Sequence, residues 1–195
     1  MECGKDAFAR RGYVVACPDY RGRFESGDDD LGNFVSYLRQ SYVDVTAAMR
    51  WLRAHAEEYR IDPEAFAITG LSYGGILSFQ VAWGVQNAAT EFVFRPPPGP
   101  VTFPLPDDPP DLGDVHREQS SAVAAAAPEV SWFPPELADP GEAPVILQNG
   151  LYDGLFPPDS AQEICPAAQA VGITCEFHLY PVGHGLDFYR PTVDD

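Results

Sequence analysis

The chain has 195 residues, of which 45% are apolar, so it is long enough for one domain with a substantial hydrophobic core. Its formal net charge of −17 argues against nucleic-acid or anionic-membrane partners, because their phosphate groups would be repelled. No apolar run approaches the length of a membrane span, and residues 1–6 lack the apolar stretch of a signal peptide. The sequence therefore predicts a globular protein, cytoplasmic by default, and leaves open whether it forms a homo-oligomer.

The first third of the chain alternates helix and strand patterns. Residues 6–11 predict a short helix that Gly12 closes, and the continuous apolar run over 13–16 predicts a central parallel strand. After a loop, apolar residues recur every three or four positions from 35 to 58, which predicts a long amphipathic helix.

The stretch from residue 65 to 83 carries the strongest functional signal. Residues 65–69 predict a buried strand, residues 70–74 match the pattern G-x-S-x-G around Ser72, and an apolar helix is expected from 76 to 83. A strand, a glycine-flanked serine and a buried helix together predict a nucleophile elbow, a strained turn that lifts the serine oxygen out of the sheet. The alternative is a glycine-rich turn that carries an incidental serine.

Two further expectations follow from an elbow at Ser72. The backbone N–H of Tyr73, at the start of the helix, would point at an oxyanion that develops on the substrate. Bulky side chains at Gly70 or Gly74 would collide with neighbouring backbone, so both positions are expected to require glycine.

A proline-rich insertion is expected at residues 86–119. The segment 92–110 has too many prolines for a helix or a central strand, so it predicts an extended loop. A loop of this length is typically a lid, a binding loop or a disordered segment. Its interleaved Phe and Val residues favour a segment that borders the Ser72 pocket, and a mobile surface loop is the alternative.

Three more strands are predicted, over residues 120–127, 145–149 and 175–180, with a helix over 159–171 between the last two. The first of these strands is ambiguous, because its alanines favour a helix by propensity, but the run is short and stops at Pro128. Strands that alternate with helices in this way predict an α/β fold, a mostly parallel sheet with helices on both faces.

A serine hydroxyl needs a base within hydrogen-bond reach, and the base needs an orienting acid. Asp153 directly follows the strand at 145–149, and His184 directly follows the strand at 175–180. Both loops lie at the carboxyl edge of the sheet together with Ser72, in the order Ser, Asp, His that hydrolases with an elbow use. We therefore predict a catalytic triad in which His184 is hydrogen-bonded to both Ser72 and Asp153.

The other histidines and nearby acids fit this chemistry less well. His55 lies in a predicted helix, His116 in the insertion, and His178 inside a strand. Asp159 begins a helix and is expected to cap it, and Asp187 is too close in sequence to the catalytic histidine to be its usual partner.

The four cysteines form no C-x-x-C pair, and no histidine is placed near two of them, so a zinc site is not expected. Cys165 and Cys175 flank a predicted helix-to-strand step, as do Cys3 and Cys17, so two local disulfides are one interpretation. Such disulfides would imply an oxidising, extracellular compartment. Four buried free thiols are the alternative.

Together these motifs resemble those of the α/β-hydrolase superfamily over nearly the whole chain. The Ser-Tyr-Gly-Gly elbow and the Asp-Tyr-Arg-Gly loop at 19–22 are similar to the prolyl-oligopeptidase and dienelactone-hydrolase branches, and residues 51–63 are similar to bacterial carboxylesterases. The resemblance implies a serine hydrolase that cleaves small carboxylic esters through an acyl-enzyme, with neither a metal nor an organic cofactor. The alternatives are a prolyl-oligopeptidase-type peptidase and a catalytically weak hydrolase-fold binding protein.

The resemblance is incomplete at the front of the chain. Such enzymes usually begin with further strands, one of which ends in a His-Gly loop that supplies a second oxyanion N–H. No such loop precedes Gly12, so an N-terminally truncated or minimal fold is expected. The strand at 13–16 is then expected to pair directly with the elbow strand, the alternative being a strand from another chain. With only the N–H of Tyr73 assured, weak esterase activity is expected, because losing one donor lowers turnover by about a hundred- to thousandfold.

Overall fold

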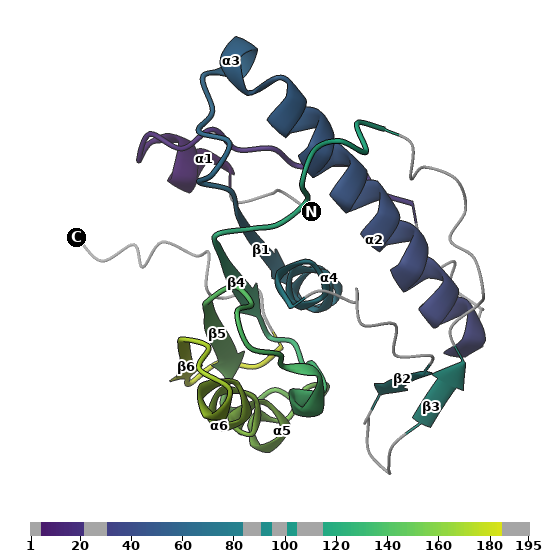
Figure 1. The fold of residues 1–195 in the computed structure, drawn as a ribbon. Helices are drawn as coiled ribbons and strands as arrows, with labels where there is room; N and C mark the ends of the chain where they lie inside the picture. The colour runs from purple at the N-terminus through teal and green to yellow at the C-terminus, as the bar shows by residue number, and fades with distance from the viewer. Residues whose placement is uncertain (1–4, 22–30, 84–90, 95–100, 105–114, 185–195) are drawn as a thin grey trace. The chain divides into compact units, whose positions relative to one another are not determined.

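The computed structural model describes residues 5–21, 31–83, 91–94, 101–104 and 115–184 (Figure 1). The chain divides into two compact units. Unit 1 contains residues 1–65 and 106–121, and unit 2 contains residues 66–105 and 122–195. A single hydrolase domain over the whole chain therefore stays a prediction.

Unit 1 is helical in its described part. Helix α1 (Lys5–Ala9) corresponds to the helix predicted over 6–11. Helices α2 (Leu31–Ala54) and α3 (Ala56–Tyr59) together correspond to the long helix predicted over 35–58. Gly12 has φ +89°, which fits its expected place after the first helix. Although α2 has 24 residues, neither it nor any other described helix is apolar enough over its length to cross a membrane.

The predicted strand at 13–16 is wrong. These residues adopt no regular secondary structure, and the side chains of Tyr13 and Val14 are 64% and 57% exposed. A strand is stable when a neighbouring strand takes up its N–H and C=O groups, and the described part of unit 1 contains no other strand. The expected direct pairing of this segment with the elbow strand is therefore also wrong.

Arginines attach the irregular segments of unit 1 to its long helix. Arg21 makes a two-pronged ion pair with Asp44 of α2, with an Nη2–Oδ1 distance of 2.7 Å. Arg50 Nε donates to the carbonyl of Val115 at 2.9 Å, and Arg53 donates to the carbonyls of Pro63 and Ser120. The last residues of the predicted insertion are thus held against α2.

Unit 2 is built on a parallel four-stranded sheet with the order β1-β4-β5-β6. Its strands are β1 (Ala67–Leu71), β4 (Ala125–Glu129), β5 (Val145–Gly150) and β6 (Cys175–Tyr180). Its helices are α4 (Tyr73–Ala82), the short 3-10 helix η1 (Pro135–Leu137), α5 (Pro158–Gln162) and α6 (Ile164–Ala170). The predicted α/β fold with a parallel sheet is confirmed.

Strand β4 begins five residues later than the predicted strand at 120–127, and Pro128 lies inside it. On either side of Pro128, Ala126 N–H donates to the carbonyl of Pro144 and Val130 N–H donates to that of Gln148. Pro128 has no N–H to donate at the intervening position, so the ladder toward β5 continues past it with one bond fewer.

Within the described residues, side chains on one face of β5 are buried and those on the other are wholly or partly exposed. Val145 and Leu147 of β5 are buried, whereas Ile146 between them is 46% exposed. In the register with β6, buried Cys175 lies opposite Val145, and exposed Glu176 lies opposite Ile146. The alternation therefore marks the face that carries Val145 as the core side of unit 2.

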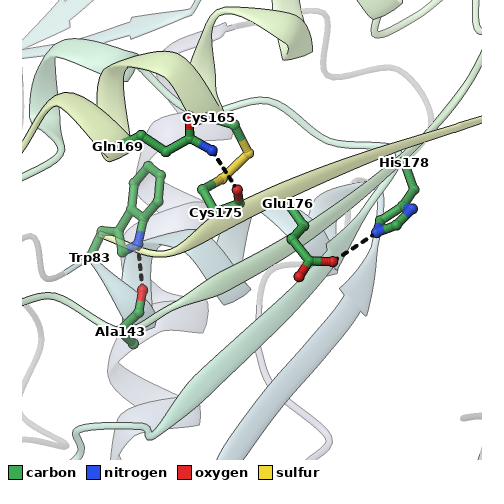
Figure 2. Close-up of a disulfide and its surroundings, with 7 residues drawn as sticks. All are labelled: Trp83, Ala143, Cys165, Gln169, Cys175, Glu176 and His178. Carbon is green, nitrogen blue, oxygen red and sulfur yellow. Dashed lines mark hydrogen bonds and ion pairs between the residues drawn. A yellow bond between two sulfur atoms is a disulfide. The ribbon is translucent and has the colours of Figure 1, made fainter. Parts of the chain in front are cut away.

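Aromatic side chains fill the core beneath the elbow helix. Phe79 of α4 and Trp83, which directly follows α4, are almost fully buried, and the Phe79 ring stacks on Phe133 with centroids 5.4 Å apart. Trp83 Nε1 donates to the carbonyl of Ala143 at 2.9 Å, just before β5 (Figure 2). The helix that follows the serine is thereby fixed to the sheet by both packing and a hydrogen bond.

A disulfide joins Cys165 of α6 to Cys175 of β6 (Figure 2). Gln169 Nε2 adds a hydrogen bond to the carbonyl of Cys175 at 2.8 Å. Cys17 is also disulfide-bonded, while its expected partner Cys3 lies outside the described residues. The expected Cys165–Cys175 bridge is confirmed, and the free-thiol alternative is wrong for the described cysteines.

The predicted insertion contains a separate antiparallel pair, β2 (Glu91–Phe94) and β3 (Val101–Pro104). The proline-rich residues 95–100 and 105–110 lie outside the described part. The expectation that the insertion borders the Ser72 pocket therefore stays a prediction.

Candidate active site

Ser72 lies in the tight connection between β1 and α4. Its backbone has φ 56° and ψ −114°, a conformation that residues other than glycine rarely adopt. Its N–H donates to the carbonyl of Glu129 at the end of β4, and its own carbonyl accepts from Ile76 N–H in α4. Two neighbouring elements therefore hold the serine in a strained turn, as predicted for an elbow.

The glycines around this turn are not equivalent. A Cβ at Gly70 would strike the backbone of Gly74, and a Cβ at Gly75 would lie 2.6 Å from Ser131 Cβ and 2.8 Å from the carbonyl of Glu129. A Cβ at Gly74 would meet no atom within 4 Å. The expectation for Gly70 is confirmed and that for Gly74 is wrong; the second tight position is Gly75.

The three predicted triad residues are brought together within unit 2. His184 Nε2 lies 2.9 Å from Ser72 Oγ, and His184 Nδ1 lies 2.9 Å from Asp153 Oδ2. The predicted hydrogen bonds from His184 to both residues are confirmed. Asp153 has no exposed side-chain surface, whereas the imidazole of His184 is 29% exposed. The three side chains therefore form one hydrogen-bonded series, from the buried carboxylate of Asp153 through the partly exposed imidazole of His184 to the hydroxyl of Ser72.

Asp153 is fixed by its own loop. Its Oδ1 accepts hydrogen bonds from the N–H groups of Leu155 and Phe156 at 2.8 and 2.9 Å. The Phe156 ring lies against the imidazole of His184, with ring centroids 5.6 Å apart. Backbone bonds from Leu151 N–H to Tyr180 O and from Tyr152 N–H to Val182 O join this loop to the one that carries His184. The loop that carries Asp153 is therefore hydrogen-bonded to the loop that carries His184.

The competing candidates take other positions. His55 and His116 belong to unit 1, where their rings meet edge to face. His178 is exposed on β6 and its Nε2 lies 3.2 Å from Glu176 Oε2 (Figure 2). Asp159 is in the first turn of α5, but the N-cap residue is a proline without a side-chain cap, so the predicted capping role is wrong. Asp187 lies outside the described residues.

Sequence reasoning missed two residues that contact this network. Asn149 and Phe156 lie in the stretch around Asp153, but the sequence reasoning gave neither of them a role. The signal for Asn149 was an amide side chain in line with the apolar residues of a buried strand. Among the described residues, no group of three or more His, Cys, Asp or Glu side chains is placed to bind a metal ion.

Comparisons with known proteins agree with this architecture. The family described as BD-FAE matches residues 1–95. A truncated carbohydrate esterase from gut microbiota aligns with a TM-score of 0.54 and 21% identity, over 74% of this chain and 61% of its own length. Esterase 2 of Thermogutta terrifontis, phosphorylated by paraoxon, aligns with a TM-score of 0.57 and 21% identity, over 76% of this chain and 54% of its own length.

The butyrate-bound form of the Thermogutta terrifontis esterase aligns with a TM-score of 0.54 and 21% identity, over 76% of this chain and 57% of its own length. A search of curated proteins found no match. The chain thus spans between 54% and 61% of the length of these three solved structures. The similarities establish the fold.

Proposed function

We propose that this chain, a member of the α/β-hydrolase superfamily, is a serine hydrolase that cleaves carboxylic esters. The observation that carries the proposal is the hydrogen-bonded series Ser72 Oγ, His184 Nε2, His184 Nδ1 and Asp153 at the end of a strained elbow. A serine activated by a histidine that a buried carboxylate orients is the arrangement used for acyl transfer.

In the proposed reaction, Ser72 Oγ attacks the ester carbonyl carbon while its proton passes to His184 Nε2. The tetrahedral intermediate then collapses, and the alcohol leaves with the proton that His184 returns. Water next attacks the acyl-serine, again giving a proton to His184, and the second collapse releases the carboxylic acid and restores Ser72. Asp153 accepts a hydrogen bond from His184 Nδ1–H throughout and stabilises the imidazolium.

The N–H of Tyr73 is the proposed oxyanion donor. Tyr73 is the first residue of α4, so its N–H lies at the positive end of the helix dipole and next to the attacking oxygen. Removing one such donor typically lowers turnover about a hundred- to thousandfold, so this N–H is expected to contribute substantially to the rate.

Esters of small acids are the proposed substrates. The solved structures with this fold include an esterase with bound butyrate and a carbohydrate esterase, and both names concern carboxylic esters. Aryl esters such as p-nitrophenyl acetate and butyrate suit a first assay, because their good leaving group makes acylation less dependent on the oxyanion site.

An oxidising, extracellular compartment is proposed for the protein. Cys165, Cys175 and Cys17 are all disulfide-bonded, and such bonds persist where thiols are not kept reduced. Thiol titration of denatured, unreduced protein taken directly from its native host should find no free thiol at these positions. Full titration of these thiols would contradict the proposed location.

The nucleophile is tested by comparing two serines of the same elbow and helix. Ser72→Ala should abolish hydrolysis of p-nitrophenyl acetate and labelling by a fluorophosphonate. Ser78→Ala is the matched control, because Ser78 is fully buried and donates to the carbonyl of Gly74. Hydrolysis and labelling retained in Ser72→Ala would exclude Ser72 as the nucleophile. Absence of both in wild type would favour the catalytically weak binding protein.

The base and the acid are tested in the same way. His184→Asn and Asp153→Asn should each lower kcat by several orders of magnitude, about ten-thousandfold for a lost orienting acid. His178→Asn and Asp159→Asn change the same residue types at exposed positions and should leave kcat within twofold. A peptidase rather than an esterase would show the same losses, but with proline-containing peptides as the faster substrates.

A further inference from the structure

Asn149 is an amide side chain at a fully buried position in the core-facing row of β5. Its exposed fraction is 0%, and it follows the buried apolar residues Val145 and Leu147 on the same face. A polar group taken out of water destabilises the fold unless hydrogen bonds replace those with water. An isosteric leucine would fill this position without that cost, so a reason for the amide must lie in what it contacts.

The amide makes one hydrogen bond, and that bond leads to the acid loop. Asn149 Nδ2 donates to the carbonyl of Phe156 at 2.9 Å, in a fully buried pair. Its Oδ1 has no hydrogen-bond partner within the described part of the chain. Because a carbonyl can only accept, the bond fixes which end of the amide faces Phe156.

Phe156 in turn touches both the proposed acid and the proposed base. Its N–H donates to Asp153 Oδ1 at 2.9 Å, and its ring lies 5.6 Å from the imidazole of His184, tilted by 33°. Holding the carbonyl of Phe156 therefore constrains the N–H that orients the carboxylate and the ring that packs against the histidine. Phe156 is itself 7% exposed, so this contact lies under the surface of the loop.

We propose that Asn149 is a positioning residue for the Asp153–His184 pair and acts through Phe156. This inference rests on the proposed function for its effect on rate, but its effect on the Asp153–His184 hydrogen bond does not depend on catalysis. Without the amide, the loop that follows Gly150 loses the hydrogen bond that ties the carbonyl of Phe156 to β5. Asp153 then samples orientations in which its oxygens no longer face His184 Nδ1.

Two variants remove the amide and differ in the size of the side chain that replaces it. Asn149→Leu keeps the volume, and Asn149→Ala leaves space, so at least one should fold if the position tolerates change. Both should lower kcat for p-nitrophenyl acetate by tenfold or more, with KM within twofold, and less than Asp153→Asn does. Val145→Ala is the stability control: it truncates a buried residue at the other end of the same strand and should leave kcat within twofold.

A proton NMR measurement separates this inference from the proposed function. The Nδ1 proton of His184, identified by its loss in His184→Asn, should give a low-field signal in wild type and Val145→Ala. That signal should broaden or move upfield in both Asn149 variants, whether or not the protein hydrolyses esters.

The outcomes are distinct. Absent esterase activity in wild type with a shifted His184 signal in the variants would refute the proposed function and support the positioning role. An unchanged signal, or a kcat loss no larger than that of Val145→Ala at matched thermal stability, would overturn the positioning role.

Discussion

One methyl group added at each of three elbow glycines tests how the chain packs around Ser72. Gly70→Ala and Gly75→Ala place the methyl against fixed neighbours, whereas Gly74→Ala places it where no atom lies within 4 Å. The three substitutions are chemically identical and lie within six residues. Differences between them therefore report the local packing rather than the chemistry of alanine.

The expected magnitudes follow from what each methyl would meet. At Gly70 the obstacle is the backbone of Gly74, which cannot rotate away, so the loss is placed near the upper end for overpacking, about 3 kcal/mol. At Gly75 the obstacles are the Ser131 side chain and the carbonyl of Glu129, and because the side chain can adjust, about 2 kcal/mol is expected. At Gly74, a helical position, alanine should stabilise by about 0.5–1 kcal/mol.

Thermal unfolding measures these differences directly. For a chain of this size about 1 kcal/mol shifts Tm by 2–4 °C, so Gly70→Ala should lower Tm by about 6–12 °C and Gly74→Ala should raise it by about 1–4 °C. Gly70→Ala should also lower kcat by about a hundredfold, because a displacement of the serine by an ångström has an effect of that size. Ser131→Gly should partly restore Gly75→Ala, since it removes the side chain that the new methyl meets.

Two results would refute this reasoning. An equal loss of stability in Gly74→Ala and Gly70→Ala would mean that the space beside Gly74 is filled in solution. A Gly75→Ala/Ser131→Gly double variant no more stable than Gly75→Ala alone would mean that the Ser131 side chain is not the obstacle.

Three further predictions concern the disulfide, a buried acid and the loop contact. Replacing Cys165 and Cys175, ten residues apart, by alanine should cost about 2.7 kcal/mol, or a Tm lower by roughly 5–11 °C than that of the oxidised protein. Burial raises the pKa of Glu142 from 4.5 to about 7, so the contribution of Glu142 to stability is fully present below pH 4.5 and is lost as pH rises to about 7; Glu142→Gln should remove that part of the Tm profile. Gly150→Ala should lower kcat by about a hundredfold, because its methyl would press on the carbonyl of Gly183 beside the base.

Each of these has a clear contrary result. An unchanged Tm in the double cysteine variant would show that the bridge constrains nothing in the unfolded chain. If the Tm of Glu142→Gln changes with pH in the same way as that of wild type, the titration belongs to another group. A wild-type kcat in Gly150→Ala would show that the loop after Gly150 and the loop at Gly183 can move apart without displacing His184.

The best predictions from sequence concern elements whose signals are local. The strand at 175–180 has the predicted boundaries, and the strand at 145–149 differs by one residue, because each has a local strand pattern closed by turn residues. The triad was predictable because the carboxyl ends of parallel strands meet at one edge of the sheet, so chain order alone brought Ser72, Asp153 and His184 together.

The errors arose where a local signal depends on a distant neighbour. The apolar run at 13–16 looks like a central strand, but whether it becomes one depends on a partner that the sequence pattern does not identify. Strand β4 includes Pro128 because its flanking residues keep the ladder to β5, which a rule against proline in central strands does not anticipate. In both cases the deciding hydrogen bonds are formed by residues elsewhere in the chain.

The sequence by itself determined the class of fold, the tight turn at Ser72 and the chain order of the three proposed triad residues, because hydrophobic periodicity and glycine spacing act within a few residues. Only the tertiary structure decided that Gly75 rather than Gly74 is tightly packed, since the obstacles are Glu129 at the end of β4 and Ser131 just after it. It also decided that Asn149 reaches the acid loop through the carbonyl of Phe156. Contacts of this kind depend on how separate segments approach in space, and no local pattern records that distance.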